Sequence, residues 1–347
     1  MNVYMKKSIL LLLSGMIFLS GCKHAEKQDD SSKISVIFET DMGNDVDDAL
    51  ALDLLFKYAD MGLINLLGVS TNKESSYSIE FLDVMKTWYG YPDLLTGKIT
   101  KGIDCENDAT NYAKATCQYQ ENGKSPFKRT HSDYGKIPES PRFYREILSK
   151  QPDQSVVIVS VGFSTNIARL LDTPPDKFSP LTGKELVYKK VKLLSMMAGQ
   201  VLNPEVQEYN VVKDIPSAQK IFREWPSNIV ISPFDVGIAI LFPATVIEKN
   251  LNYTRPNPLK IAYESYLPMP YDRPTWDLTS VLYAVEGVKN YFNISPWGRI
   301  EVDDEAHTRF YPDEKGKHAF LSVSEEQAEI VKNRFVELIS TKPKPFK

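Results

Sequence analysis

Apolar runs and amphipathic stretches alternate along most of this 347-residue chain. Residues 35–40 form a β-branched, apolar run typical of a strand buried on both faces, and residues 46–58 follow with apolar side chains at helical spacing. The expected strands are 35–40, 64–71, 155–161, 187–197 and 228–232, and the expected helices are 46–58, 79–89, 141–149, 167–171, 215–225, 278–288 and 324–339. This order predicts an α/β fold with a mostly parallel, Rossmann-like central sheet flanked by helices.

Two regions depart from this alternation. Residues 92–141 are polar, irregular and longer than an ordinary connection, so we expect an excursion over the surface. Between residues 299 and 323, short strand-like pieces predict a small antiparallel addition. Ser324 and Gln327 form a capping-box sequence that predicts the start of the last helix.

The first 33 residues are typical of export rather than of a folded domain. Residues 8–19 are apolar, follow two lysines, and have the length of a signal-peptide core rather than of a membrane span. Residues 19–22, LSGC, resemble the lipobox of bacterial lipoproteins, in which cleavage precedes the Cys and its sulfur receives a diacylglycerol. We expect a signal peptide at 1–21, a lipidated Cys22 with a polar tether at 22–33, and one domain at 34–347.

The lipobox would make this an exported, membrane-anchored lipoprotein of the bacterial cell envelope. An ordinary signal peptide or an uncleaved anchor, with Cys22 incidental, is the alternative. Export would also place Cys105 and Cys117 in an oxidising compartment, where two thiols in one irregular segment predict a disulfide.

Charge narrows the class of partner. The formal net charge is −4 and there is no basic stripe with interleaved aromatic residues, which argues against nucleic acid and favours a small-molecule substrate. The sequence leaves homo-oligomer formation open.

The highest density of acidic residues in the sequence follows the first expected strand. Five acidic residues fall within ten positions, namely Glu39, Asp41, Asp45, Asp47 and Asp48. Carboxylates at this density raise one another's pKa unless they are solvated, cap a helix or share a cation. Two interpretations are open: first-turn acids that stabilise the following helix, or a metal site.

Other expected strands also end in polar sequence. Ligands of open α/β sheets bind beyond the carboxyl ends of the strands, where such segments converge. Asn72, residues 161–166, residues 196–210 and Asp277 supply oxygen-rich groups without His or Cys. This donor set suits a hard cation such as calcium better than zinc.

These residues carry a family resemblance. DMGNDVDDALAL at 41–52 resembles the aspartate signature of the nucleoside hydrolases, in a longer variant with extra residues between the first aspartate and the closing pair. VGFSTNIA at 161–168 resembles the family's TGPLTNIA turn, EYN at 208–210 with Asp214 resembles its EFN and DPEAA block, and WD at 276–277 stands where a late aspartate begins a helix. The four blocks occur in the family's order, between about residues 36 and 288.

The resemblance implies calcium-dependent hydrolysis of the N-glycosidic bond of a nucleoside or related ribosyl compound, as in nucleoside salvage. Asp41, Asp48, Asp277 and the Val161 carbonyl would bind Ca²⁺, and Asp41 would also be the general base. The implied substrate contacts are Asp47, Asn203, Glu208, Asn210, Asn72 and Trp276. Glu39 and Asp45 are left as bystanders or supports.

Trp276 is the main departure from the family pattern. Many members that cleave inosine or uridine place a His there as proton donor to the departing base, whereas a Trp can stack on a base but cannot donate a catalytic proton. Either stacking or a donor such as His131, Tyr271 or Arg273 activates the leaving group, or the natural substrate is not a common nucleoside. A rival hypothesis is a non-catalytic ribose- or nucleoside-binding lipoprotein that retains the calcium site.

Overall fold

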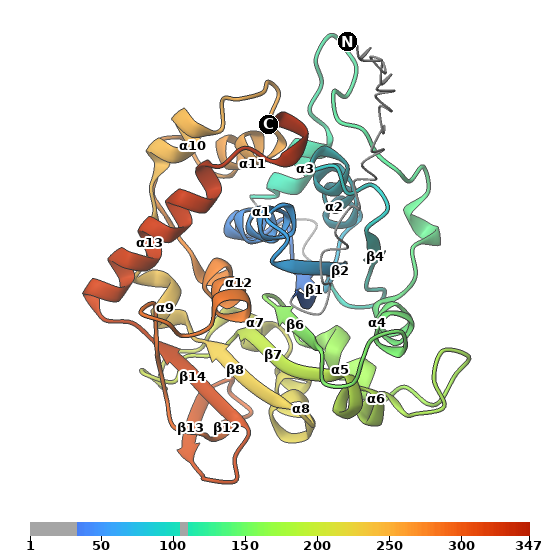
Figure 1. The fold of residues 1–347 in the computed structure, drawn as a ribbon, viewed down its shortest axis with the longest axis vertical. Coiled ribbons are helices and arrows are strands. Elements are labelled where there is room, and N and C mark those ends of the chain that lie inside the picture. Colours follow the sequence, from blue (N-terminus) through green and yellow to red (C-terminus); the bar gives the residue numbers. More distant parts are fainter. Residues whose placement is uncertain (1–32, 105–109) are drawn as a thin grey trace, which may run out of the picture. The chain divides into compact units, whose positions relative to one another are not determined.

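A mixed, mostly parallel sheet runs through the middle of the domain (Figure 1). The computed structural model describes residues 33–104 and 110–347. In spatial order the strands are β13 (Thr308–Pro312), β12 (Gly298–Val302), β14 (His318–Ser322), β8 (Asn228–Ser232), β7 (Val191–Met197), β6 (Val156–Ser160), β1 (Ile34–Thr40), β2 (Ile64–Thr71) and β4 (Leu95–Gly97), with β11 (Asn293–Ile294) paired to β14. Neighbours from β14 to β4 are parallel, and β11, β12 and β13 add antiparallel pairings. The predicted α/β fold is confirmed.

Helices pack on both faces of this sheet. One face is covered by α1 (Asp47–Asp60), α2 (Ser76–Trp88), α3 (Tyr112–Cys117), α9 (Phe234–Ile238), α10 (Ala244–Asn250), α11 (Pro258–Tyr266), α12 (Trp276–Glu286) and α13 (Glu325–Ser340). The other is covered by α4 (Ser140–Ser149), α5 (Thr165–Leu171), α6 (Gly183–Lys190) and α8 (Ile215–Glu224). The short elements are α7 (Tyr209–Lys213), β3 (Lys73–Glu74), β5 (Ile103–Asp104), β9 (Leu241–Phe242), β10 (Arg273–Pro274) and the 3₁₀ turns η2 (Tyr134–Lys136) and η3 (Lys344–Phe346).

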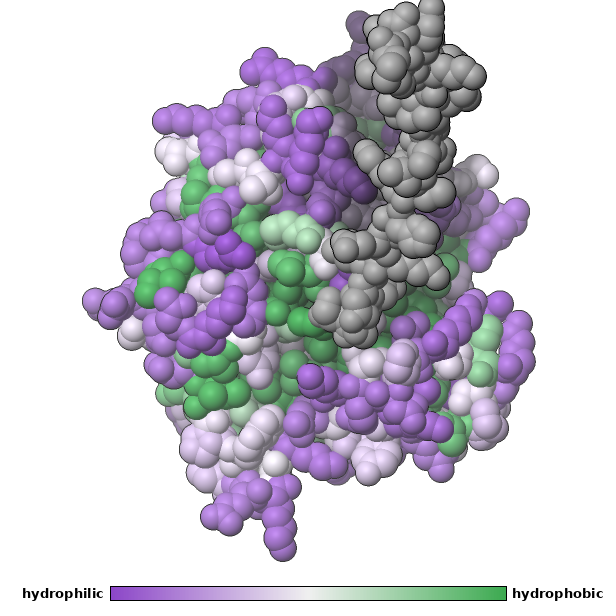
Figure 2. Space-filling view, viewed as in Figure 1, coloured by the Kyte–Doolittle hydropathy of each residue, from purple (hydrophilic) through white to green (hydrophobic). Residues whose placement is uncertain are grey.

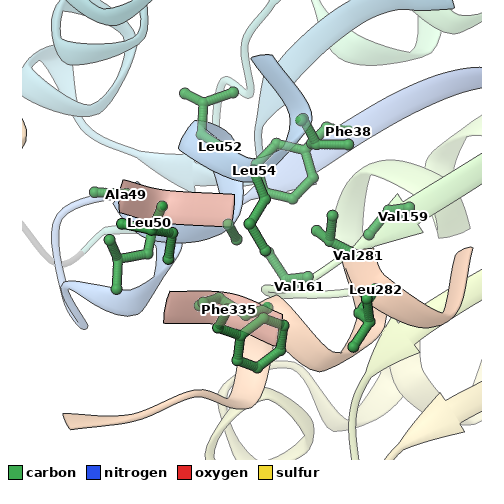
Figure 3. Packing of buried hydrophobic residues seen from close by; sticks show 14 of the residues in the cluster. Phe38, Ala49, Leu50, Leu52, Leu54, Val159, Val161, Val281, Leu282 and Phe335 are labelled. Carbon is green, nitrogen blue, oxygen red and sulfur yellow. The ribbon is translucent and has the colours of Figure 1, made fainter. Parts of the chain in front are cut away.

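The strand pleat divides the core into two layers. Successive residues of a strand face opposite sides, so Phe38 of β1 joins the α1 layer and Ile37 joins the α4 layer. Figure 3 shows Phe38 and Val159 of the sheet beside Leu54 of α1 and Val281 of α12. Because both faces of β1 are covered, its sequence is apolar almost throughout, and this fixes the point at which the acidic turn begins.

Some predicted boundaries were wrong. Residues 187–190 belong to α6 rather than to a strand, because Thr182 and Glu185 form a capping box that starts a helix at Gly183. The small antiparallel addition predicted between residues 299 and 323 is present as β12 and β13, while β14 joins the main sheet parallel to β8. The Ser324–Gln327 capping box is confirmed at the start of α13.

The predicted signal peptide, Cys22 and the tether up to residue 32 lie outside the described residues, as does Cys105. The predicted disulfide is not formed: Cys117 is a buried free thiol, with Sγ 3.8 Å from the Tyr77 carbonyl oxygen. None of the helices in the described ranges combines the length and apolar character of a membrane span. Figure 2 shows hydrophobic side chains gathered near the middle of the visible face and hydrophilic ones around them.

Candidate active site

A cavity of about 460 Å³ lies beyond the carboxyl ends of the central parallel strands. Residues that follow β1, β6, β7 and β8 reach it, and α7, α12, the end of α11 and the segment before α3 also contribute to its wall. The lining residues are Asp41, Asn44, Asp45, Asp47, Asp48, Thr110, Val161, Met197, Glu208, Tyr209, Asn210, Lys213, Phe234, Tyr266, Trp276 and Asp277. Every site residue named from the sequence lines it, except Asn72 and Asn203.

The amino ends of α1 and α12 meet at the floor of the cavity. Asp47 and Asp48 form the first turn of α1, and both are buried. The backbone N–H of Asp277 donates to Asp47 Oδ2 at 3.0 Å, and Thr40 Oγ1 donates to Asp48 Oδ1. Helix amino ends favour negative charge, so both helices support the ionised carboxylates placed there.

Burial and mutual repulsion perturb this cluster strongly. Burial raises the pKa of Asp41 to about 6, and the nearby Lys73 ammonium opposes that rise. The pKa values of Asp47, Asp48 and Asp277 lie well above their usual range. Burial is the larger cause, and repulsion by the neighbouring carboxylates is the second. Asp48 and Asp277 also interact directly through their carboxyl groups. Four carboxylates this close are stabilised together only by protons or by positive charge.

The donor set fits a hard cation. In the described ranges, no three acidic, histidine or cysteine side chains already stand around one point as metal ligands. The fit therefore rests on donor chemistry: Asp41, Asp48, Asp277 and the Val161 backbone line one cavity and offer oxygen only. Calcium prefers several carboxylate and carbonyl oxygens, which is the combination present here.

Gly162 lets two of these groups approach each other. A Cβ built on Gly162 would lie 2.7 Å from Asp41 Oδ1 and 2.5 Å from Asn72 Oδ1, so no larger residue fits without displacing Asp41. Asn72 is fully buried behind the cavity wall and does not line it. In this structure Asn72 therefore supports the site from below, next to the carboxylate of Asp41.

The opposite wall is built around α7. Glu208 caps this helix and accepts backbone N–H bonds from Gly199 at 3.0 Å, Asn210 at 2.7 Å and Val211 at 3.1 Å. Asn210 Nδ2 lies 3.3 Å from the Val161 carbonyl oxygen. Burial raises the pKa of Glu208 to about 7, although the three N–H donors oppose the rise. Asn203 is exposed in the preceding turn and lies outside the cavity lining.

Aromatic side chains form one side of the cavity. Trp276 stacks on Phe234 at a centroid distance of 5.4 Å, and its indole N–H donates to the Phe234 carbonyl oxygen at 3.0 Å. Tyr266 lines the cavity beside them. Because the indole N–H already has an acceptor, Trp276 offers a fixed flat surface rather than a hydrogen-bond donor.

Asp45, which lines the cavity, and Arg273, which does not, support this aromatic wall. The two side chains form a bidentate ion pair, with Nε to Oδ1 at 2.9 Å, and the guanidinium lies 5.2 Å from the centre of the Trp276 ring. Tyr271 donates its hydroxyl to the Tyr263 carbonyl oxygen, and His131 lines a different cavity. Of the three donors considered from the sequence, none lines the cavity of the acidic cluster.

Besides the Asp45–Arg273 ion pair, a buried lysine also holds the acidic turn in place. Lys73, fully buried at the start of β3, donates to Asn44 Oδ1 at 2.5 Å. The Asn44 amide in turn donates to Asp41 Oδ2 at 3.1 Å and to the Tyr209 hydroxyl at 3.3 Å. Asn44 and Asp45 lie between the first aspartate and the closing pair, and each is held by one basic side chain.

Glu39 supports the turn from beneath. It is fully buried and accepts the Tyr144 hydroxyl at 2.7 Å and the Ser160 hydroxyl at 3.0 Å. Burial raises its pKa to about 7 against the effect of these donors. Glu39 therefore joins β1, β6 and α4 below the cavity and does not line it.

Comparison with known proteins decides the family. The sequence model of the family described as inosine-uridine preferring nucleoside hydrolase matches residues 36–309. The chain belongs to this family. It is therefore an N-ribosyl hydrolase, a glycosidase, and the resemblance seen in its four sequence blocks is confirmed. No curated protein sequence gives a significant match.

Solved structures share the fold of this nucleoside hydrolase. A plant nucleoside hydrolase superimposes with a TM-score of 0.68 at 16% identity, over 89% of this chain and 99% of its own. A purine-preferring ribonucleoside hydrolase from Gardnerella vaginalis gives 0.66 at 19% identity, over 88% and 98%. An inosine-uridine preferring nucleoside hydrolase from Bacillus anthracis gives 0.65 at 16% identity, over 88% and 98%.

Sequence reasoning missed several cavity residues of this hydrolase. Phe234 and Tyr266 carry no motif, and Tyr209 lies within the EYN block but was not expected to line the cavity. The burial of Lys73 next to Asn72 could not be anticipated, because lysines are rarely buried without partners. The only sequence signal for the Asn44 clamp is the extra length of the aspartate turn.

Proposed function

We propose that this protein is a calcium-dependent nucleoside hydrolase that splits a nucleoside or related ribosyl compound into base and ribose. The observation that carries the proposal is the meeting of Asp41, Asp48 and Asp277 with the Val161 backbone in one buried cavity. Family membership supports hydrolysis, and the oxygen-only donor set supports calcium. Calcium bound by these oxygens would act as a Lewis acid that makes a neighbouring water more acidic.

Asp41 is the proposed general base. The Asn44 side-chain amide donates a hydrogen bond to Asp41 Oδ2 at 3.1 Å, and this contact orients the carboxylate within the cavity. In this role Asp41 accepts the proton of a water that attacks the anomeric carbon of the sugar. The transition state of such a reaction carries oxocarbenium character, so the surrounding carboxylates stabilise its positive charge.

The remaining cavity residues would bind the two halves of the substrate. Asp47, Glu208 and Asn210 line the cavity with oxygen and amide groups that suit ribose hydroxyls. Trp276 and Phe234 present a flat apolar surface that suits a base. We propose stacking on Trp276 as the way in which the leaving group is held.

The rival hypothesis is a binding protein that retains the site without turnover. It is favoured by the engaged indole N–H of Trp276 and by the absence of a histidine from the cavity lining in the described residues. The test is to incubate the protein with purine and pyrimidine nucleosides, with and without a strong calcium chelator, beside Asp41→Asn. We expect base release that both changes abolish. Binding without release would support the rival, and release that survives the chelator would rule out the metal mechanism.

We also propose that the protein is a lipoprotein anchored through Cys22. The lipobox-like residues 19–22 support this proposal. Expression of the parent and of Cys22→Ser in a bacterial host, followed by membrane fractionation and mass spectrometry of the amino-terminal peptide, tests it. A diacylglycerol-modified Cys22 in the parent alone is expected; an unmodified Cys22 in a membrane-bound parent would overturn the proposal.

A further inference from the structure

The edge of the sheet opposite to the cavity carries exposed lysines. Strands β14, β8, β7, β6, β1 and β2 are parallel, so their amino ends meet at one edge while the cavity lies beyond their carboxyl ends. Lys317 precedes β14, Lys192 is the second residue of β7, and Lys189 lies near the end of α6, where its carbonyl accepts the N–H of Gln154. All three lysine side chains are exposed.

These lysines share a groove of about 430 Å³. Its lining also includes Tyr188, which is 63% exposed, and one acidic residue, Asp153. The Asp153 carboxylate is paired with Lys190 at 2.7 Å, so it does little to offset the positive charge of the groove. The groove therefore presents an excess of ammonium groups in a protein whose formal net charge is −4.

The chain enters the domain at the same edge. The Ile34 N–H donates to the Leu63 carbonyl oxygen at 3.2 Å, which places the start of β1 beside an exposed apolar turn. Met61 and Leu63 of that turn are 44% and 45% exposed. The first described residues of the domain therefore lie at this edge and not on the cavity side.

The carboxyl-terminal tail returns to this edge as well. The Lys344 N–H donates to Asp60 Oδ2 at 2.6 Å, next to Met61, and Phe346 packs on Trp88 at a centroid distance of 4.6 Å. Lys342, Lys344 and Lys347 are exposed. We define the amino-edge surface by its apolar and basic members: Met61, Leu63, Tyr188, Lys189, Lys192, Lys317, Lys342, Lys344 and Lys347.

We propose that the amino-edge surface docks on an anionic lipid bilayer and holds the hydrolase with its cavity directed away from the membrane. Lysines near a bilayer that contains anionic lipids are attracted to it, and their long apolar stems let the ammonium groups reach the headgroups. Exposed aliphatic and tyrosine side chains beside them suit the interfacial layer. The exposed apolar turn with Met61 and Leu63 favours a bilayer over a nucleic acid as the occupant. This proposal does not depend on the proposed activity or on lipidation.

Vesicle flotation tests the proposal with residues 33–347, which form one compact unit by themselves. We expect this protein to float with vesicles of equal parts phosphatidylcholine and phosphatidylglycerol, but not with phosphatidylcholine alone, and to be released by salt. Lys189→Glu/Lys192→Glu should weaken binding roughly a hundredfold, because two charges are reversed near the surface. The melting temperature and nucleoside turnover should stay unchanged, since neither lysine lines the cavity.

The matched control is Lys101→Glu/Lys114→Glu, which makes the same change in net charge. Lys101 lies just before β5, and Lys114 lies on α3, whose Ala113 is next to Gly43 of the acidic turn. Both lysines therefore lie toward the cavity side, and both are exposed. The control should float like the parent. Equal loss in both variants, or equal binding to neutral vesicles, would overturn the proposal.

Orientation can be measured separately. An environment-sensitive fluorophore on Leu63→Cys should shift to shorter wavelength on anionic vesicles, and one on Leu202→Cys should not. Both leucines are exposed, but Leu202 lies in the turn after β7 on the cavity side. Both labels are placed in a Cys105→Ser background, and the buried Cys117 should not react. A shift at Leu202→Cys alone would show the opposite orientation and contradict the proposal.

Discussion

Replacement of Lys73 by Met tests how the catalytic base is oriented. The Lys73 ammonium donates to Asn44 Oδ1 at 2.5 Å, and Asn44 Nδ2 donates to Asp41 Oδ2 at 3.1 Å. An ammonium group cannot accept a hydrogen bond, so this contact fixes the Asn44 amide with its N–H groups toward Asp41. Without Lys73 the amide can rotate and turn its carbonyl oxygen toward a carboxylate.

The expected loss follows from the interaction that is removed. A hydrogen bond to a charged group contributes about 1.5–3 kcal/mol. If that amount is lost from the transition state, kcat should fall roughly 10- to 150-fold, because each 1.4 kcal/mol corresponds to about a factor of ten. Met keeps the apolar stem of Lys73, so packing changes little. Calcium should bind more tightly to the variant, since a positive charge beside the carboxylates has been removed.

The assay combines steady-state turnover of the best nucleoside with calorimetric titration of calcium. Lys57→Met is the matched control: Lys57 is also a buried lysine, paired with Asp53 at 2.8 Å on α1, and does not line the cavity. It should lower stability and leave kcat and KM unchanged. Asn44→Ala and the double variant Lys73→Met/Asn44→Ala should have similar kcat values, because both residues act through one contact. A parental kcat in Lys73→Met, or additive losses in the double variant, would refute the reasoning.

Three further outcomes are expected. Trp276→Ala should lower kcat/KM roughly tenfold through loss of base stacking, while Trp276→Phe keeps most activity; equal activity in all three proteins would exclude stacking. Calcium should raise the melting temperature of the parent more than that of Asp277→Asn, because an ion that binds only the folded state stabilises it; equal shifts in scanning calorimetry would remove Asp277 from the ligand set. Burial lowers the pKa of His318 from 6.5 to about 4, and its Nδ1 accepts the Ile300 N–H at 2.9 Å. Between pH 6.5 and 4 the unfolded chain therefore binds a proton at His318 that the folded protein does not. In urea unfolding, the free energy of unfolding of the parent should fall over this range by up to about 3 kcal/mol more than that of His318→Asn. Parallel pH profiles of the two proteins would contradict this.

Much of the fold was predictable because its strongest signals are local. The apolar run before Asp41 and the helical spacing after it identify β1 and α1 without knowledge of their partners. The helix α6 was missed because its last turn, with Val187 and Tyr188, is separated from the apolar residues of β7 only by Lys189 and Lys190, so a single strand was expected across the boundary. The capping box at Thr182 and Glu185 was the readable signal for that helix.

Site residues could be predicted where their chemistry agrees with a sequence motif. They could not be predicted where only tertiary contacts determine whether a side chain reaches the cavity. Asp48 and Asp277 could be named together only through the family motif, since helices far apart in sequence bring them into contact. Asn203 has the right residue type for a sugar contact, but the turn after β7 leaves it exposed. Lys73 has the composition of a surface residue and becomes a buried clamp only once β3 lies beside the acidic turn.

The central claim is that the buried carboxylates act with calcium to hydrolyse a nucleoside. The most direct measurement is the initial rate of base release as a function of free calcium concentration, with calcium binding measured on the same sample. The rate should rise from near zero and saturate with the same midpoint as calcium binding, and Asp48→Asn should shift both midpoints together. Full turnover in the presence of excess chelator, or calcium binding that leaves the rate unchanged, would contradict the claim.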